Sequence, residues 1–276
     1  MELIPALVLL FGCALISVPG HASDLPSGIE KCAITDEQCL VNGVNYVLRN
    51  YAQSGIKQLG LIPLDPLHIK KFKIARNPHS PVNIDLSFHE VDLLGLQQAV
   101  AKRVSGFKSD LGHPIELVMS VPEIVVKGPY SVDGRVLILP ITGKGNAEIK
   151  LSKYRLLFRF IMQLNLNSIY NINPTVKTKV RALIKFRRVS KGDHQTFAEV
   201  VDIKVDIDPA HVTYHLENLF NGQKDLSENM HVLINENWQD IFTELKPGIG
   251  EAFALIAKAV LDRIFGKLPL EQLFLA

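Results

Sequence analysis

Cysteine is scarce in this chain of 276 residues, which contains only Cys13, Cys32 and Cys39. No two of them form a C-x-x-C pair, and the sequence also lacks the G-x-S-x-G, H-E-x-x-H and Walker A motifs. Residues 143–145 read Gly-Lys-Gly, but no helix signal follows them, so they do not match a phosphate-binding loop. Because these catalytic patterns are missing, we expect a protein that is not an enzyme and that uses no metal or cofactor.

A strong excess of charge is also missing. The formal net charge is +2, and removing residues 1–22, which hold one acid and no base, raises it to +3. This value is too small to indicate a nucleic-acid partner, and we interpret the basic clusters at 76–79 and 185–188 as solvated surface. After residue 22 no segment reaches 18 uninterrupted apolar residues, so we expect no stable membrane insertion.

The one long apolar run is at the N-terminus, where residues 1–22 read MELIPALVLLFGCALISVPGHA. Gly20 and Ala22 place small residues at −3 and −1 of a cleavage site, which predicts a secretory signal peptide and an extracellular protein. Glu2 and the absence of Lys or Arg are atypical for such a peptide. The alternative, a membrane anchor, is disfavoured because the run is short for a span of about 20 residues. Residues 23–276 would then form a single domain.

Cleavage would remove Cys13 and leave Cys32 and Cys39 as an even pair in an oxidising compartment. We predict a disulfide between them, which the chain-entropy model values at about 2–3 kcal/mol. A metal site would need two further ligands at suitable spacing, and none are nearby. The only N-x-S/T match, 173–175, has proline in the middle, so we expect no N-linked glycan.

Apolar periodicity predicts a helix over 36–54, with Gly55 as its end, and then a loop over 60–69. A long region of period two follows, which predicts antiparallel sheet with one apolar face. A phase slip at His89-Glu90 suggests a bulge, and 132–134 and 191–193 read as hairpin turns. The alternating segments are 82–93, 115–126, 156–166, 180–186, 197–207 and 212–216.

The C-terminal region predicts a long helix from Asp225 or Ser227 to about Gly266, kinked or split near Pro247. Its last part, 249–265, is apolar nearly all round, so the helix should be surrounded. The five charged residues of one narrow stripe should mark the line where the helix meets water: Asp240, Glu244, Glu251, Lys258 and Asp262. A sheet that must bury one face and a helix of this kind together predict an elongated α+β fold, with the antiparallel sheet curved around the helix.

Several polar groups could be taken for functional sites. His211 and His215 are four apart, but on a strand this spacing is roughly 13 Å, so we expect exposed histidines and no metal site. The carboxylates of Asp202, Asp206 and Asp208 read as a solvated face. The inward-reading aromatic residues could fill a core or line an apolar channel, in which Tyr214, Tyr170 or Tyr51 could supply a polar group.

Six segments occur in the order known from one insect family, after a signal peptide. They are LPSGIEKC with a second cysteine seven residues on, GLIPLDPLHI, GPYSVDGRVLILPITGKGNAEIKL at 128–151, LENLFNGQKDLSENM, NENW at 235–238, and LPLEQLF at 268–274. On these segments the chain resembles the takeout / juvenile hormone-binding protein family over about 250 residues. The last segment departs mildly, with Leu270-Glu271-Gln272 where a Tyr-Asp-Glu-like sequence is common.

The resemblance implies a long helix wrapped by a strongly curved antiparallel sheet, related to tubular lipid-binding domains. It also implies carriage of a small hydrophobic ligand in an internal tunnel, such as a juvenile hormone-like terpenoid or a fatty-acyl molecule. Takeout-like members are linked to feeding, circadian output and behaviour. The disulfide carries over to Cys32 and Cys39. We expect a monomer, with an unidentified receptor as a further candidate partner.

The family has no motif for ligand contacts, so the tunnel-lining residues are chosen from the inward-reading positions of the predicted elements. They are Phe88, Leu156, Phe158, Phe160, Ile184, Phe186, Val205, Tyr214, Trp238, Phe242, Phe253, Ile256 and Phe265. Two other hypotheses stay open. One is a secreted signalling or interaction protein whose channel is filled by side chains. The other is a lipid-ester hydrolase, for which the sequence offers no serine in an elbow motif.

Overall fold

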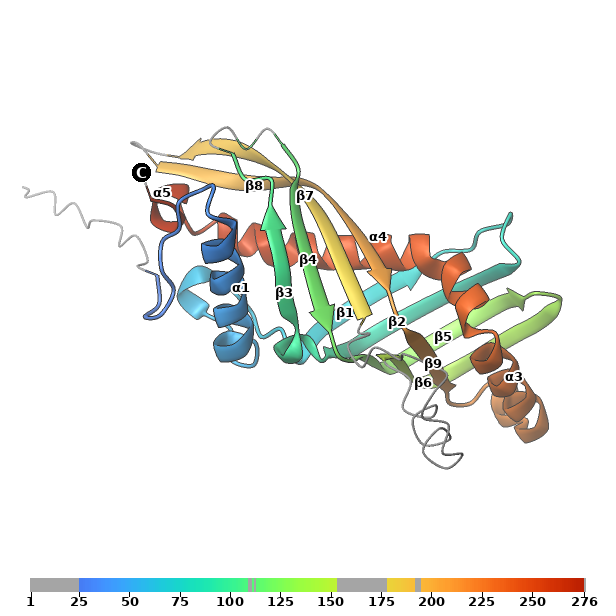
Figure 1. Cartoon of the computed structure of the whole chain (residues 1–276). Coiled ribbons are helices and arrows are strands. Elements are labelled where there is room, and N and C mark those ends of the chain that lie inside the picture. The colour runs from blue at the N-terminus through green and yellow to red at the C-terminus, as the bar shows by residue number, and fades with distance from the viewer. Residues whose placement is uncertain (1–24, 109–110, 112, 153–177, 192–194, 276) are drawn as a thin grey trace, which may run out of the picture.

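The computed structural model describes residues 25–108, 111, 113–152, 178–191 and 195–275. In these parts of the chain, two antiparallel sheets form an elongated body, and a long C-terminal helix runs along it (Figure 1). The predicted α+β architecture of a curved antiparallel sheet and a long helix is therefore confirmed. The signal peptide, the alternation over 156–166 and Tyr170 lie outside the described residues.

The first sheet has the strand order β1-β2-β5-β6-β9 and the second the order β3-β4-β7-β8. The strands of the first sheet are β1 (Leu67–Ile74), β2 (Val82–Leu94), β5 (Ile124–Val136), β6 (Leu139–Ser152) and β9 (His211–Leu216). Those of the second are β3 (Val100–Ser105), β4 (Ile115–Val121), β7 (Thr178–Lys191) and β8 (Gln195–Asp208). Their apolar residues alternate with polar ones and face inward, as in β7, where Ala182, Ile184 and Phe186 are buried between exposed neighbours.

The predicted bulge is present in β2, where the register against β5 shifts between Phe88 and Asp92 and Glu90 has a φ of 49°. The hairpin turn predicted at 132–134 is wrong. These residues continue β5, and the chain turns between Val136 and Leu139 instead. Gly134 lets β5 approach β2 closely, because a Cβ on it would lie 2.3 Å from the main-chain oxygen of Asn83 in β2. The hairpin predicted around 191–193 is confirmed by the pairing of β7 with β8.

The segment read as a loop over 60–69 enters a strand, since β1 begins at Leu67. The Asp65 carboxylate fixes the approach to this strand, because it accepts hydrogen bonds from the main-chain nitrogens of Gly95 and Gln97, the latter at 2.8 Å. A short 3-10 turn, η1 (Lys57–Leu59), precedes it, and η2 (Leu96–Gln98) lies at its anchor point.

The first helix, α1 (Glu37–Tyr51), begins after Asp36, whose side chain accepts a hydrogen bond from the main-chain nitrogen of Cys39. The predicted disulfide joins Cys32 to Cys39. It lies beside the C-terminal segment, because the main chain of Cys32 bonds with those of Leu273, the last residue of α5 (Leu270–Leu273), and Leu275. The two ends of the described chain are thus held together.

The C-terminal helical region divides at a place that the sequence does not reveal. It begins with η3 (Phe220–Gly222) and α3 (Lys224–Glu236), breaks at Asn237, and continues as α4 (Trp238–Phe265). Helix α3 begins at Lys224, close to the predicted start at Asp225 or Ser227. Of the two outcomes predicted near Pro247, a kink or a split, the split is wrong, since Pro247 lies inside α4. The helix tolerates it because Pro247 and Thr243 are both exposed, so water can solvate the Thr243 carbonyl that proline leaves without a main-chain donor.

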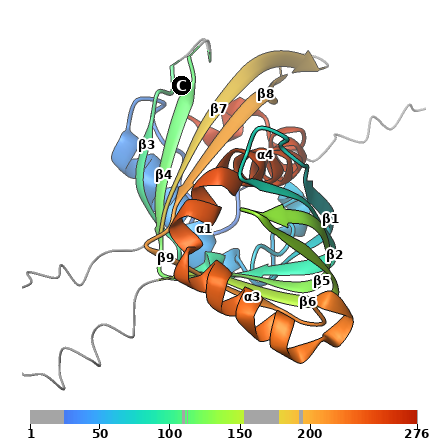
Figure 2. The same cartoon turned by 90° about the vertical axis from the view of Figure 1, so that its right-hand side faces the viewer.

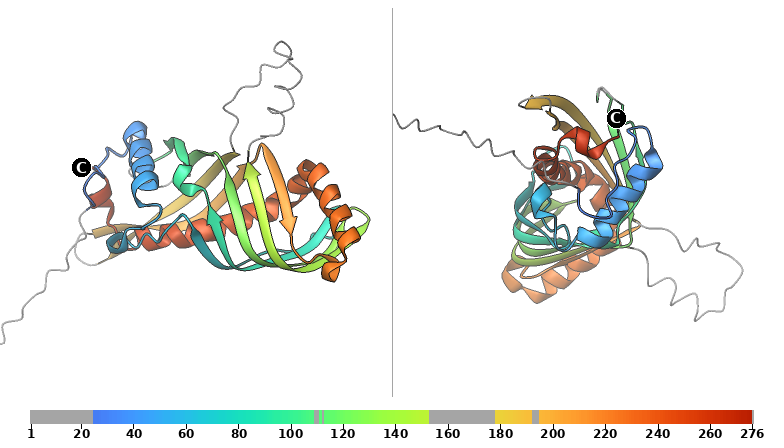
Figure 3. Two further views of the ribbon diagram at one scale, coloured as in Figure 1. Left: turned by 90° about the horizontal axis from the view of Figure 1, so that it is seen from below. Right: turned by 90° about the vertical axis from the view of Figure 1, so that its left-hand side faces the viewer.

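Helix α4 lies where the two sheets part, between the edge strands β8 and β1 (Figure 2). Seen from below, it passes behind the strands along the length of the body (Figure 3). The five charged residues of the predicted stripe are all exposed or half-buried. Lys258 reaches Asp262 and the main chain of Val200 in β8, and Glu244 reaches Ser80 before β2. The stripe therefore follows the open line between the two sheet edges.

Helix α4 meets water along this stripe, as expected, and Leu255, four residues after Glu251, falls on the same face. Its buried residues are Ile241, Phe242, Leu245, Gly250 and Ala252. Beyond them, Leu255 is 72% exposed. Among the described residues, no helix combines the length and the apolarity that crossing a bilayer requires.

Candidate functional site

A small apolar cavity lies between α4 and the inner face of the first sheet. Thirteen residues line it, and twelve of them are apolar. The strands contribute Phe72, Ile74, Leu86, Phe88, Val126, Ile149, Leu151, Val212 and Tyr214, and α4 contributes Phe242, Leu245, Ile249 and Phe253. No charged side chain is found among these lining residues, so the cavity presents a neutral, low-polarity surface.

The walls of the cavity follow from the periodicities of the elements. Residues two apart on a strand share a face, which brings Phe72 of β1 opposite Phe88 of β2 with the rings stacked at 4.5 Å. Residues three and four apart on a helix share a face, which brings Phe242, Leu245, Ile249 and Phe253 to the same side of α4.

Tyr214 is the one polar residue of the lining. It lies in β9 between the buried Val212 and Leu216, and its side chain is 8% exposed. Its hydroxyl is buried and has no hydrogen-bond partner among the described residues. Burial raises the pKa of this phenol, so the group is a neutral hydroxyl over the physiological range.

The cavity has a volume of about 50 Å³. Pockets that enclose a drug-sized ligand are typically about 300–1,000 Å³. A ligand of that size must therefore displace wall residues of this cavity.

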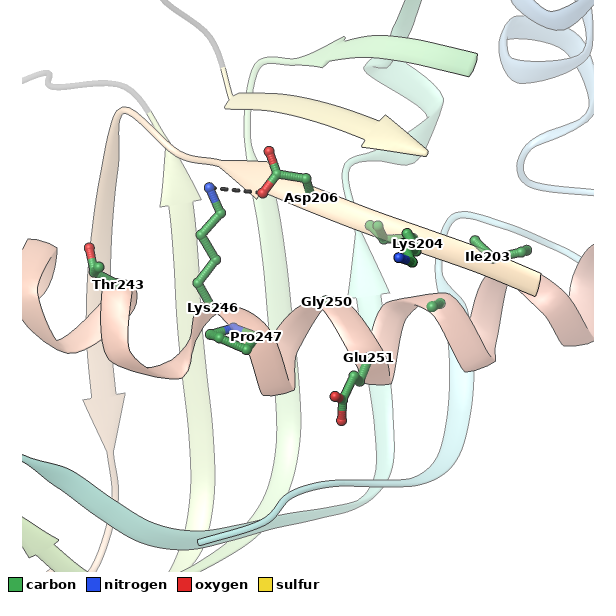
Figure 4. Close-up of a pocket in the computed structure, with 10 residues that line it drawn as sticks. Ile203, Lys204, Asp206, Thr243, Lys246, Pro247, Gly250 and Glu251 are labelled. Carbon is green, nitrogen blue, oxygen red and sulfur yellow. Dashed lines mark ion pairs between the residues drawn. The ribbon is translucent and has the colours of Figure 1, made fainter. Parts of the chain in front are cut away.

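A second, more open hollow lies between β8 and α4, with a volume of about 450 Å³ (Figure 4). Lys246 of α4 spans it and pairs with Asp206 of β8, with Nζ 2.9 Å from Oδ1. At Gly250 the helix comes so close that an added Cβ would lie 2.5 Å from the Val205 carbonyl oxygen. We name this hollow the α4–β8 groove.

The chain is similar to proteins of known family and structure. The model of the family described as haemolymph juvenile hormone binding protein (JHBP) matches residues 6–168 and 153–275. The chain belongs to this family. The resemblance found in the sequence segments is thereby confirmed.

The curated relatives include the circadian clock-controlled protein daywake of Drosophila yakuba, which is 28% identical over 284 aligned positions that span both chains completely. The protein of the same name from Drosophila melanogaster is 26% identical, over 90% of this chain and 88% of its own. Among solved structures, Takeout 1 of Epiphyas postvittana matches with a TM-score of 0.71 at 23% identity, over 90% of this chain and all of its own. This structural likeness supports the juvenile hormone-binding protein fold.

The predicted tunnel-lining residues fall into three groups within this fold. Phe88, Tyr214, Phe242 and Phe253 come together around the cavity, and Trp238 and Ile256 pack against the same core. The second core, under the other sheet, holds the rest: Ile184, Phe186, Val205 and Phe265, with Val205 in contact with both cores. In it the rings of Phe186 and Phe265 meet edge to face at 4.8 Å. Leu156, Phe158 and Phe160 lie outside the described residues.

Sequence reasoning missed nine of the lining residues. Phe72 and Ile74 were missed because the two adjacent lysines 70 and 71 interrupt the alternation of β1, although each half of the strand keeps its own period of two. Val126, Leu86 and Val212 stand at apolar positions of the alternating segments but were not among the residues chosen as tunnel lining. The remaining ones are Ile149, Leu151, Leu245 and Ile249.

The histidines of β9 differ from the expectation at one position. His215 is exposed as predicted and lies near the His231 ring of α3 at 5.6 Å. His211 is half-buried, because the junction of α3 and α4 covers the start of β9 and places the Trp238 ring 5.0 Å away. Within the described ranges, no cluster of three or more His, Cys, Asp or Glu could hold a metal ion.

Proposed function

We propose that this protein is a secreted carrier that binds a small hydrophobic molecule between α4 and the first sheet. In this proposal residues 1–22 are removed as a signal peptide and 23–276 act as one domain. The observation that carries it is the cavity itself, whose lining is apolar at twelve of thirteen positions. Membership of the juvenile hormone-binding protein family supports the same reading, and it also supports a binding protein over an enzyme.

The binding energy would come from apolar burial, at about 25 cal/mol for each Å² removed from water. Because the cavity is small, the ligand would widen it by moving α4 side chains such as Ile249 and Phe253, which are only half-buried. A terpenoid or fatty-acyl chain could then extend along α4 past Ile256 and Val260, which are also half-buried.

The test uses the full chain secreted from insect cells, stripped of lipid and titrated with the fluorescent apolar probe N-phenyl-1-naphthylamine. Ile249→Trp should fill the cavity and weaken probe binding at least about fivefold, since overpacking such a site costs roughly 1–3 kcal/mol. Leu255→Trp is the matched control, because Leu255 lies on the same helix and is 72% exposed, and it should bind as the parent does.

Native mass spectrometry of the undelipidated protein would give the mass of any molecule that co-purifies. The small cavity volume favours a second candidate, an interaction protein with a filled core. That candidate requires no co-purifying lipophile and no saturable binding of the probe, and this pair of results would overturn the carrier proposal.

A further inference from the structure

The fold contains two buried tyrosines in the first sheet whose hydroxyls have opposite surroundings. The Tyr130 hydroxyl donates a hydrogen bond to the main-chain oxygen of Glu217 at 2.8 Å. The Tyr214 hydroxyl is also buried, lines the apolar cavity, and finds no partner among the described residues. A buried hydroxyl without a partner costs roughly 1–3 kcal/mol, so most buried tyrosines have one.

Tyr214 cannot easily withdraw from this position, because its main chain is held on both sides. On one side β9 pairs with β6, where Tyr214 lies opposite Ile149. On the other side the Asn235 amide of α3 accepts from the Tyr214 nitrogen at 2.8 Å and donates to the Tyr214 oxygen at 2.9 Å. Helix α3 thus covers the edge of β9, and the phenol stays directed into the apolar interior.

The surroundings also restrict what the hydroxyl can bind. No Lys, Arg or His is among the residues that line the cavity, so nothing there would neutralise an ionised carboxylate. Moving an unpaired carboxylate out of water costs far more than one hydrogen bond returns. A neutral oxygen that accepts a hydrogen bond has no such penalty.

We propose that the Tyr214 hydroxyl determines ligand specificity by donating a hydrogen bond to a neutral acceptor oxygen of the ligand. The preferred ligand would be an apolar molecule with a carbonyl, ester or ether oxygen. Plain hydrocarbons, which lack an acceptor, and ionised fatty acids, which carry an unpaired charge, would bind less tightly. This inference rests on the proposed carrier function and adds to it the residue that selects the ligand.

The experiment compares three competitors of similar length, namely methyl dodecanoate, tridecane and dodecanoic acid. Each displaces N-phenyl-1-naphthylamine from the delipidated full chain at pH 7.5. The parent protein should prefer the ester to the hydrocarbon by about fivefold, the value of one net hydrogen bond. The ester should also bind more tightly than the ionised acid.

Two variants make the test specific. Tyr214→Phe should lower ester affinity about fivefold, to that of tridecane, and leave tridecane binding unchanged. Its melting temperature without ligand should not fall, because the change removes a hydroxyl that has no partner in the described part of the chain. Tyr130→Phe, the matched control, should lower the melting temperature and keep the preference for the ester.

The outcomes separate this inference from the carrier proposal. If the parent protein binds ester and hydrocarbon equally, or if Tyr214→Phe weakens both equally, the specificity role is wrong while the carrier proposal stands. Preferred binding of dodecanoic acid would also overturn it. If neither the probe nor any competitor binds, the carrier proposal itself fails.

Discussion

His211 opens β9 with its ring edge-on to Trp238, the single tryptophan of the chain, at a centroid distance of 5.0 Å. Partial burial lowers the pKa of this histidine from its ordinary value of 6.5. The unfolded chain therefore takes up the proton at higher pH than the folded one. Stability tied to His211 is present above pH 6.5 and declines as the pH falls through that value.

Trp238 fluorescence provides a direct readout at this residue, because a protonated imidazole quenches indole emission more strongly than a neutral one. We predict a quenching transition with a midpoint below 6.5 while the protein remains folded. His211→Gln should abolish the transition. A midpoint at or above 6.5, or a transition that survives in His211→Gln, would contradict this assignment.

Some residue roles could be predicted from the sequence and others could not. Cys32 and Cys39 were predicted as a disulfide because their number and spacing leave few alternatives, and the bond is present. The sequence did not reveal why Asp65 belongs to a family segment. Its carboxylate bonds to main-chain nitrogens about 30 positions away, and no local pattern encodes that contact.

At the scale of elements, the contact between α4 and β8 depends on one glycine. A Cβ on Gly250 would lie 2.5 Å from the Val205 carbonyl oxygen, so Gly250→Ala must push the helix away from the strand. We predict a loss of about 1–3 kcal/mol in the free energy of unfolding, measured by chemical denaturation.

Gly43→Ala in α1 is the matched control, because a Cβ there would meet nothing within 4 Å. It replaces a helical glycine without a clash and should raise stability by about 0.5–1 kcal/mol. Equal effects of the two substitutions would show that helix propensity, and not the approach to β8, governs position 250.

The existence of the elements was more predictable than their ends. Period-two alternation found β2, β7, β8 and β9 because each has one buried face, and it also found β4, whose middle residues are all half-buried. The break between α3 and α4 was placed at Pro247 from local sequence. It occurs at Asn237 because α3 turns away to bond with the edge of β9 through Asn235, which is a tertiary contact.

At the scale of the whole molecule, the curved sheet around a helix followed from the need to bury one sheet face, and it is present. Periodicity shows which face of a strand points inward, but not whether the interior is filled. Phe186 and Phe88 read alike in the sequence, yet Phe186 packs in the second core and Phe88 lines the cavity. Because that cavity is small, the rate of ligand entry should depend on how easily its walls move apart.

Uptake of a lipophile would require α4 to shift relative to the sheet edges between which it lies. The Lys246–Asp206 ion pair across the α4–β8 groove opposes this shift, and partly exposed pairs of this kind contribute about 0.2–1 kcal/mol. We predict that Asp206→Asn speeds both association and release of N-phenyl-1-naphthylamine by up to about fivefold, with little change in affinity, in stopped-flow measurements.

Glu199→Gln on the same strand is the control, since Glu199 pairs with Arg187 on the outer face of the second sheet, where both side chains are exposed. It removes an equal charge from β8 but leaves the contact with α4 intact, so both rates should stay at the parent values. If Asp206→Asn and Glu199→Gln change the rates equally, the effect is one of net charge. The groove would then not be where the helix separates from the sheet during ligand entry.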